Sequence, residues 1–196
     1  MQRAQSTTLK ARLPRSSSRD ICLTNPATIL GAILAGGQAR RFGSDKAHAL
    51  VDGIRLIDRV ADALGSQTTA LLVCGREEPG FGCTPDLPEP GLGPLGGLNA
   101  ALEFATAKGF TYVLSAGVDV PNLPADLVQQ LAGKNAAIAQ SQPVGGLWPV
   151  ALADALQDYI NEGGRALYGF ADHVHARRIA FDPPLLNVNA PSDLPD

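Results

Sequence analysis

The fold class is decided by residues 28–46, Thr-Ile-Leu-Gly-Ala-Ile-Leu-Ala-Gly-Gly-Gln-Ala-Arg-Arg-Phe-Gly-Ser-Asp-Lys. Their first part, through Ala35, is a short apolar run bounded by turn residues, which is typical of a buried strand in a parallel sheet. Glycines directly after such a strand let a ligand approach the backbone. The arginines and the lysine that follow suit a polyphosphate. The stretch therefore predicts a nucleotide-phosphate loop at the carboxyl end of the first strand.

Two familiar phosphate-binding loops do not fit this stretch. A P-loop has Gly-Lys followed by Ser or Thr, whereas Lys46 follows Asp45 and precedes Ala47. The dinucleotide-binding fingerprint has three glycines spaced two and three residues apart at the start of a helix, and the glycines here lack that spacing. A simple glycine turn with solvated charges is the alternative, and the two arginines and the Asp-Lys pair in one short segment argue against it.

Strand-like and helix-like segments alternate along the rest of the chain, which is typical of a parallel sheet covered on both faces. We predict one α/β domain over residues 28–196: a Rossmann-like, three-layer α/β/α domain with a mostly parallel sheet. Residues 75–93 are rich in Gly and Pro and are expected to form a loop. The expected strands are 29–35, 69–74, 110–115, 136–140 and 175–181, and the expected helices are 54–64, 95–107, 124–131, 150–161 and 164–171.

The bulk properties restrict the class of protein. A chain of 196 residues with 45% hydrophobic content fits one globular domain. No apolar run approaches the roughly 20 residues that cross a bilayer, so we expect no membrane partner. The cysteines, Cys22, Cys74 and Cys83, lack metal-ligand spacing and cannot all pair. This pattern favours a reducing compartment and predicts a cytoplasmic protein, with Cys74 as a small buried residue.

Charge is distributed unevenly. Residues 1–20 carry five basic side chains and one acidic one, a net charge of +4, which leaves −7 for the rest of the chain. We predict that residues 1–27 form a disordered basic tail, and an organellar transit peptide or a start codon placed too early would have the same composition. A body of net charge −7 argues against nucleic acid as a partner.

The motif in residues 34–47 resembles the signature of the molybdenum cofactor guanylyltransferases. It consists of Leu-Ala-Gly-Gly, three residues, Arg, an apolar residue, Gly, one residue and Asp-Lys-Ala. Four later segments agree in order and spacing, over about residues 29–194. They are Gly93-Pro94-Leu95-Gly96-Gly97-Leu98, Asp119-Val120-Pro121, Gly146-Leu147-Trp148-Pro149 and Asn187-Val188-Asn189-Ala190-Pro191. The resemblance implies a fold of the nucleotide-diphospho-sugar transferase type.

Asp119 is the candidate metal ligand. A carboxylate at a strand end beside a phosphate loop suits Mg²⁺ bound to a triphosphate, because phosphates and waters complete the octahedron. The alternative from the residues alone is a helix cap for the next segment. The resemblance implies that Asp119 is the metal-binding Asp and that Mg²⁺ is the cofactor.

Lys46 and Arg41 are the candidate catalytic cations, together with Asp119. Nucleotidyl transfer builds negative charge on the leaving pyrophosphate, and fixed cations stabilise that charge. The resemblance implies that Lys46 binds GTP. The resemblance also implies nucleotide binding by the backbone after the first strand, by the glycine-rich helix start and by a loop carboxylate. The implied nucleotide-binding residues are Leu34, Ala35, Gly36, Gly37, Lys46, Asp86, Gly93 and Asp119.

Two of these nucleotide assignments have plain alternatives. Asp86 follows a proline in the Gly/Pro-rich segment, and the alternative is an ordinary loop carboxylate. The glycines from Gly93 to Gly97 supply free N–H groups at a helix start, and a simple loop-to-helix turn would look the same. The family also uses a polar residue near the end of the second strand, and Val73-Cys74-Gly75-Arg76 has no Asn.

The acceptor side of the site rests on three residues. Asn187 and Asn189 alternate along an extended segment and so face the same way, and the resemblance implies that they lie at the pterin end. The resemblance implies that Arg165 matches a family arginine that binds the acceptor phosphate. The alternative is a solvated surface arginine. The three histidines show no ligand spacing and receive no role.

We therefore predict a nucleotidyltransferase that transfers GMP from GTP to the terminal phosphate of molybdenum-molybdopterin. The products are the molybdopterin guanine dinucleotide cofactor and pyrophosphate, and molybdoenzyme apoproteins or chaperones are possible partners. One alternative is a cytidylyltransferase acting on the same pterin or on a sugar or alditol phosphate. Another is a carrier that binds the nucleotide or cofactor without catalysis.

Overall fold

A computed structural model describes residues 27–36 and 46–188 of the protein. Apart from Ala27, the predicted N-terminal tail lies outside the described residues. So do Gly37, Arg41 and Asn189.

A seven-stranded, mostly parallel sheet forms the middle of the domain. Its strand order is β5-β4-β1-β6-β8-β7-β9, and β8 alone runs antiparallel to its two neighbours. The other pairs, β1 with β4 and β6, β4 with β5, and β7 with β9, are parallel. The strands are β1 (Ile29–Leu34), β4 (Ala70–Cys74), β5 (Cys83–Thr84), β6 (Tyr112–Gly117), β7 (Ala137–Ala139), β8 (Gly146–Pro149) and β9 (Arg177–Ile179).

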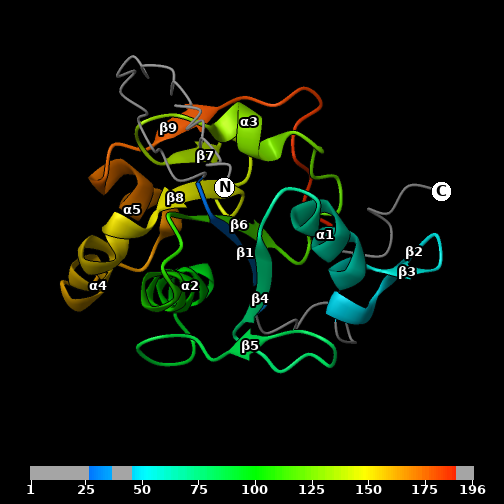
Figure 1. Ribbon diagram of the computed structural model, residues 1–196, viewed down its shortest axis with the longest axis horizontal. Helices are drawn as coiled ribbons and strands as arrows, with labels where there is room; N and C mark the ends of the chain where they lie inside the picture. Colours follow the sequence, from blue (N-terminus) through cyan, green and yellow to red (C-terminus); the bar gives the residue numbers. More distant parts are fainter. Residues whose placement is uncertain (1–26, 37–45, 189–196) are drawn as a thin grey trace, which may run out of the picture.

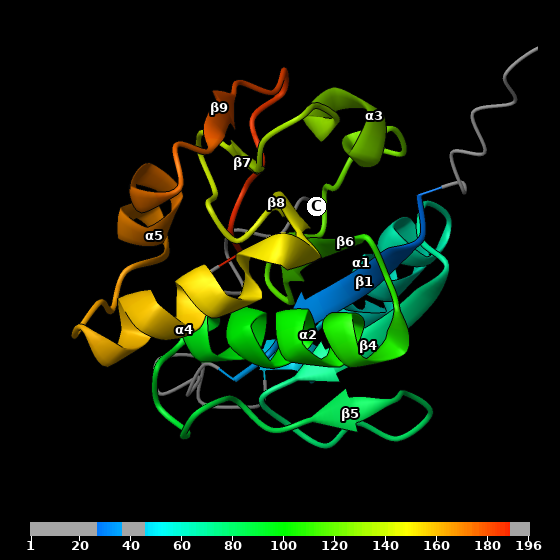
Figure 2. The same ribbon diagram turned by 60° about the vertical axis from the view of Figure 1, so that its left-hand side comes forward.

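Helices cover both faces of the sheet (Figures 1 and 2). On one face lie α2 (Pro94–Lys108), α4 (Ala153–Asn161) and α5 (Leu167–His173), and on the other lie α1 (Leu56–Gly65) and α3 (Leu127–Leu131). Each layer packs an apolar helix stripe against the sheet; α1, for example, buries Ile57, Val60 and Leu64. The predicted three-layer α/β/α domain is confirmed.

Two separate cores result, one on each side of the sheet. The core under α2, α4 and α5 contains Trp148, which stacks on Phe170 with ring centroids 5.7 Å apart. The indole Nε1 donates to Ser115 Oγ at 2.9 Å, and this hydroxyl donates to the Val144 carbonyl at 2.7 Å. The one polar group of the tryptophan is thereby satisfied, as burial requires.

Several short strands were missing from the sequence-based prediction. β8 lies where only a Gly-Leu-Trp-Pro motif was recognised, and β5 lies inside the predicted loop 75–93. The predicted helix from residue 54 begins only at Leu56, because Ile54–Arg55 (β3) pairs with Leu50–Val51 (β2) in a small hairpin. Asp52 and Gly53 form its turn with φ of 50° and 77°, as a two-residue hairpin requires.

The remaining boundaries differ at the ends. The predicted helices from 124 and 164 begin at Leu127 and Leu167, and the residues from 150 to 152 form a 3₁₀ turn, η2 (Val150–Leu152), before α4. Helix ends are the least determined part of a sequence pattern. In the part of the chain that the structure describes, no helix has the length and apolar character that a membrane crossing requires.

Candidate active site

The carboxyl ends of three central strands meet at one edge of the sheet. Leu34, the last residue of β1, is in register with Cys74 of β4 on one side and Gly117 of β6 on the other. The residues that follow each strand therefore gather at this edge, where open α/β sheets bind their ligands. Gly36 follows β1, Gly75 follows β4 and Asp119 follows β6.

Lys46, Asp119 and Asn187 form a polar group at this edge. The Lys46 ammonium donates to Asp119 Oδ2 at 2.9 Å and to Asn187 Oδ1 at 3.4 Å. The side chains of Lys46 and Asp119 are only 15% and 25% exposed, so their attraction is less screened than that of a surface pair. Lys46 thus contacts two residues that lie 73 and 141 positions away in the chain.

The segment from Pro184 to Val188 brings Asn187 to the site. Its end is fixed by the Val188 N–H, which donates to the Asp119 carbonyl at 2.9 Å. Its start is held by Asn122, whose side chain donates to the Pro184 carbonyl at 3.1 Å and accepts from the Leu186 N–H at 3.0 Å. Asn122 comes shortly after Asp119, so the loop after β6 carries one site residue and anchors another. Sequence analysis gave Asn122 no role.

A second group lies beside the first, around the carboxylate of Asp86. The backbone of Gly36 approaches so closely that a Cβ there would overlap Asp86 Oδ2. A Cβ on Gly75 would lie 2.6 Å from Asp86 Oδ1 and 2.7 Å from the Gly36 nitrogen. A Cβ on Gly97, in the first turn of α2, would lie 3.4 Å from Asp86 Oδ1. Glycine at these positions leaves the carboxylate against bare backbone.

Asp86 is buried without a partner among the described residues. The residue is only 7% exposed, and its Oδ1 atom is buried and accepts no hydrogen bond. Burial raises the pKa of its carboxyl above the ordinary value. Buried polar atoms without partners are rare in folded proteins and call for an explanation. This unsatisfied acceptor lies at the edge of the sheet where open α/β sheets bind their ligands.

Helix α2 starts at the same edge. Gly93 is its N-cap residue with a φ of 60° and a ψ of −144°, a conformation that favours glycine, and Pro94 is the first helical residue. The Leu87 N–H, directly after Asp86, donates to the carbonyl of Gly96 at 3.2 Å. This bond ties the Asp86 loop to the first turn of α2, so Asp86, Gly36 and the helix start are parts of one structure.

The Arg165 side chain is hydrogen-bonded to backbone carbonyls at the end of α4 and in the turn after it. It lies in the exposed turn between α4 and α5 and donates to the Ile160 carbonyl at 3.0 Å and to the Gly164 carbonyl at 2.7 Å. It therefore caps the end of α4, and these bonds run to the helix end rather than to the Lys46 group. Gly37, Arg41 and Asn189, the other predicted site residues, lie outside the described residues.

The Lys46 group offers oxygen ligands for a divalent cation. Among the described residues no cluster of three or more His, Cys, Asp or Glu side chains could enclose a metal ion. Mg²⁺ on a nucleotide needs only one or two protein oxygens, because it keeps several waters and binds the phosphates. Asp119 Oδ2 and Asn187 Oδ1 already converge on one cation, the Lys46 ammonium. The donor set therefore fits Mg²⁺ bound to a triphosphate.

The family match, the sequence relatives and the similar structures all point to nucleotidyltransferases. Residues 31–176 match the family described as MobA-like NTP transferase domain. A protein of Cereibacter sphaeroides named molybdenum cofactor guanylyltransferase is 38% identical over 180 residues, which cover 85% of this chain and 93% of that protein. Among solved structures, molybdopterin-guanine dinucleotide biosynthesis protein A from Archaeoglobus fulgidus has a TM-score of 0.67 at 21% identity, covering 85% of this chain and 94% of the other. The 2-C-methyl-D-erythritol 4-phosphate cytidylyltransferase of Thermus thermophilus has a TM-score of 0.63 at 16% identity, with shares of 85% and 94%.

Proposed function

Since the chain belongs to the MobA-like NTP transferase family, we propose that it transfers GMP from GTP to the terminal phosphate of molybdenum-molybdopterin. The products are the molybdopterin guanine dinucleotide cofactor and pyrophosphate. The observation that carries the proposal is the meeting of Lys46, Asp119 and Asn187 at the carboxyl edge of the central strands. A cation and a carboxylate next to each other at this edge suit a nucleoside triphosphate and its metal ion.

In this reaction an oxygen of the acceptor phosphate attacks the α-phosphorus of GTP, and the bond from that phosphorus to the pyrophosphate oxygen breaks. The acceptor is already an anion, so no strong general base is required. Catalysis then consists of aligning two anions and neutralising the charge that grows on the leaving group. We assign the neutralising charge to Lys46, and the binding of the phosphates to the backbone at Gly36 and at the start of α2.

The Lys46–Asp119 ion pair has a direct role in nucleotide binding. When Mg²⁺ is bound, it supplies charge neutralisation on the triphosphate, and Asp119 with Asn187 would hold it. With those oxygens on a metal ion, the Lys46 ammonium would be available to the phosphates. The flexible lysine stem allows this change without movement of the backbone.

Asp86 supports guanine as the base. Guanine presents two neighbouring donors, N1–H and N2–H, and a carboxylate accepts from both because it has two acceptor oxygens. Asp86 has an unpartnered buried oxygen beside Gly36. Cytosine presents a single amino donor on its pairing edge and would leave one oxygen unsatisfied. We therefore assign the base to Asp86, which favours GTP over CTP.

The other assignments follow from the same geometry. We assign the acceptor side to Asn187 and Asn189, and in view of its capping bonds Arg165 reaches the acceptor phosphate only if those bonds are exchanged. A cytoplasmic location suits the free thiols of Cys74 and Cys83. Molybdoenzyme apoproteins or their chaperones are the proposed recipients of the product, and residues 1–27 are proposed as a tail that precedes the domain.

Pyrophosphate release tests the proposal and its alternatives. The protein is incubated with Mg²⁺, molybdenum-molybdopterin and one of GTP, CTP or ATP. Release with GTP and the acceptor together is the expected result. Release with CTP instead would move the protein to the cytidylyltransferases, and GTP binding without any release would identify a carrier. His175→Ala is the control variant, because His175 lies in the turn before β9 and has no part in the proposed site.

A further inference from the structure

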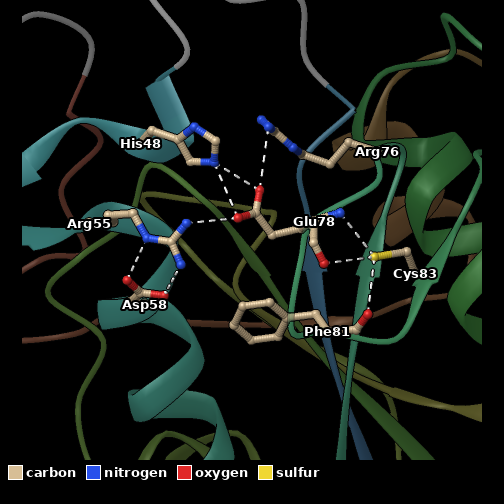
Figure 3. A network of polar contacts seen from close by, with 7 residues as sticks. All are labelled: His48, Arg55, Asp58, Arg76, Glu78, Phe81 and Cys83. Carbon is tan, nitrogen blue, oxygen red and sulfur yellow. Dashed lines mark hydrogen bonds and ion pairs between the residues drawn. The ribbon is translucent and has the colours of Figure 1, made fainter.

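A buried carboxylate, that of Glu78, lies in the loop after β4 and faces the turn that carries Lys46. The Glu78 side chain has no exposed surface. Figure 3 shows that three side chains surround it. The distances are 3.0 and 3.2 Å from His48 Nε2, 2.9 Å from Arg55 Nη1 and 3.4 Å from Arg76 Nη2. A buried charge persists only with such partners.

The three partners come from three segments that border the site. His48 ends the 3₁₀ turn η1 (Lys46–His48), which begins with Lys46 itself. Arg55 ends β3 and is held in place by Asp58, with two contacts of 2.7 Å. Arg76 directly follows Gly75, whose backbone lies against Gly36. Glu78 therefore joins the Lys46 group to the Asp86 group.

Glu78 is in turn fixed to the sheet. Its N–H donates to Cys83 Sγ at 3.2 Å, and its carbonyl accepts from the Phe81 N–H at 3.2 Å. Cys83 belongs to β5 and is in register with Val73 of β4. The carboxylate is thus anchored on the central sheet, and it contacts His48, the last residue of η1. The Ala49 N–H, just after η1, donates to the Lys46 carbonyl at 3.2 Å.

We propose that Glu78 is a positioning residue for nucleotidyl transfer: through His48 it fixes the Lys46–His48 turn and so the place of the Lys46 ammonium beside the triphosphate. This inference rests on the proposed function. Buried ion clusters add little net stability, and replacement by apolar residues is often neutral or favourable. Their value lies in the geometry they impose. A displacement of about 1 Å at a catalytic group costs up to about 10²-fold in rate.

The first test measures local order without any substrate. Hydrogen exchange is followed by mass spectrometry in the full-length wild type, His48→Ala and Glu78→Gln. Both variants are expected to speed exchange in peptides that cover residues 46–49, with α2 and β6 unchanged. Unchanged exchange at 46–49 would overturn the inference. His173→Ala, which removes a histidine from the far helix α5, is the matched control.

The second test measures whether the network acts through Lys46. We expect His48→Ala to lower kcat for pyrophosphate release about 10-fold, with a smaller effect on KM for GTP. His48→Gln, which keeps a donor toward Glu78, is expected to restore most of the rate. In a Lys46→Met background the His48→Ala substitution should cost less than about 2-fold, because its only route to the chemistry is gone.

The outcomes separate the two proposals. Equal losses from His48→Ala with and without Lys46 would show a merely structural network and overturn the inference. Absence of pyrophosphate release by the wild type would overturn the proposed function and the kinetic role of Glu78 with it. The exchange result would then still decide whether Glu78 orders the turn.

Discussion

Replacing Gly75 by alanine tests the close approach of backbone and carboxylate at the nucleotide end of the site. Gly75 has a φ of +87°, and a side chain in a left-handed conformation costs about 1–2 kcal/mol. The new Cβ would also lie 2.6 Å from Asp86 Oδ1 and 2.7 Å from the Gly36 nitrogen. Backbone cannot yield as a flexible side chain does, so we add about 1–3 kcal/mol for overpacking.

Gly80→Ala is the matched control for this prediction. Gly80 has a φ of +91°, close to that of Gly75, but a Cβ there would have nothing within 4 Å. Both variants should be destabilised by the left-handed backbone conformation, and only Gly75→Ala should be destabilised further by overpacking. The free energy of unfolding from urea titration is therefore expected to fall by about 1–3 kcal/mol more in Gly75→Ala than in Gly80→Ala.

Nucleotide binding should separate the same two variants. Gly75→Ala displaces Gly36 or Asp86 and is expected to weaken GTP binding, measured by calorimetry in the presence of Mg²⁺, whereas Gly80→Ala should bind as the wild type does. Equal unfolding free energies and equal GTP affinities in the two variants would refute the described packing of Gly36, Gly75 and Asp86.

Three further predictions follow from single contacts. Because burial raises the pKa of Asp86, its contribution to stability is greatest below about pH 3.9, the unfolded value, and is lost as the pH rises through the folded pKa. Asp86→Asn should therefore stabilise the ligand-free protein at pH 7, flatten this part of the pH profile of Tm, and weaken GTP binding. Ser115→Ala removes the acceptor of the buried Trp148 indole and should lower the unfolding free energy by about 1–3 kcal/mol, unlike Ser66→Ala at an exposed helix end. Asp119→Asn should lower kcat by about 10²-fold and raise the Mg²⁺ concentration at half-maximal rate, and an unchanged Mg²⁺ titration would contradict its role as metal ligand.

The central part of the fold was predictable because it depends on short-range patterns. The apolar run before Gly36 and the helical spacing of Ile57, Val60 and Leu64 each identify an element without reference to the rest of the chain. Parallel strands then bring Gly36 and Asp119 to the same sheet edge by topology alone. Lys46 and Asn187 also reach Asp119, but their places depend on the turn η1 and on the segment 184–188, which the order of the strands does not determine.

What could not be predicted depends on contacts between distant segments. β8 is four residues long and antiparallel, and its identity comes from its partners β6 and β7 rather than from its own sequence. The sequence does not explain why the end of the second strand has a glycine at position 75. The structure does, because a side chain on Gly75 would overlap the backbone of Gly36. Glu78 has three basic partners, at positions 48, 55 and 76, which meet only in the folded chain.

The most direct test of guanylyl transfer is the mass of the product. The full-length protein is incubated with GTP, Mg²⁺ and molybdenum-molybdopterin, and the pterin fraction is analysed by mass spectrometry, with Lys46→Met as the impaired comparison. The proposed function predicts a pterin that has gained one GMP unit, formed with one pyrophosphate per product and strongly reduced in the variant. Recovery of the pterin without GMP, while GTP remains bound or is hydrolysed to free GMP, would contradict it.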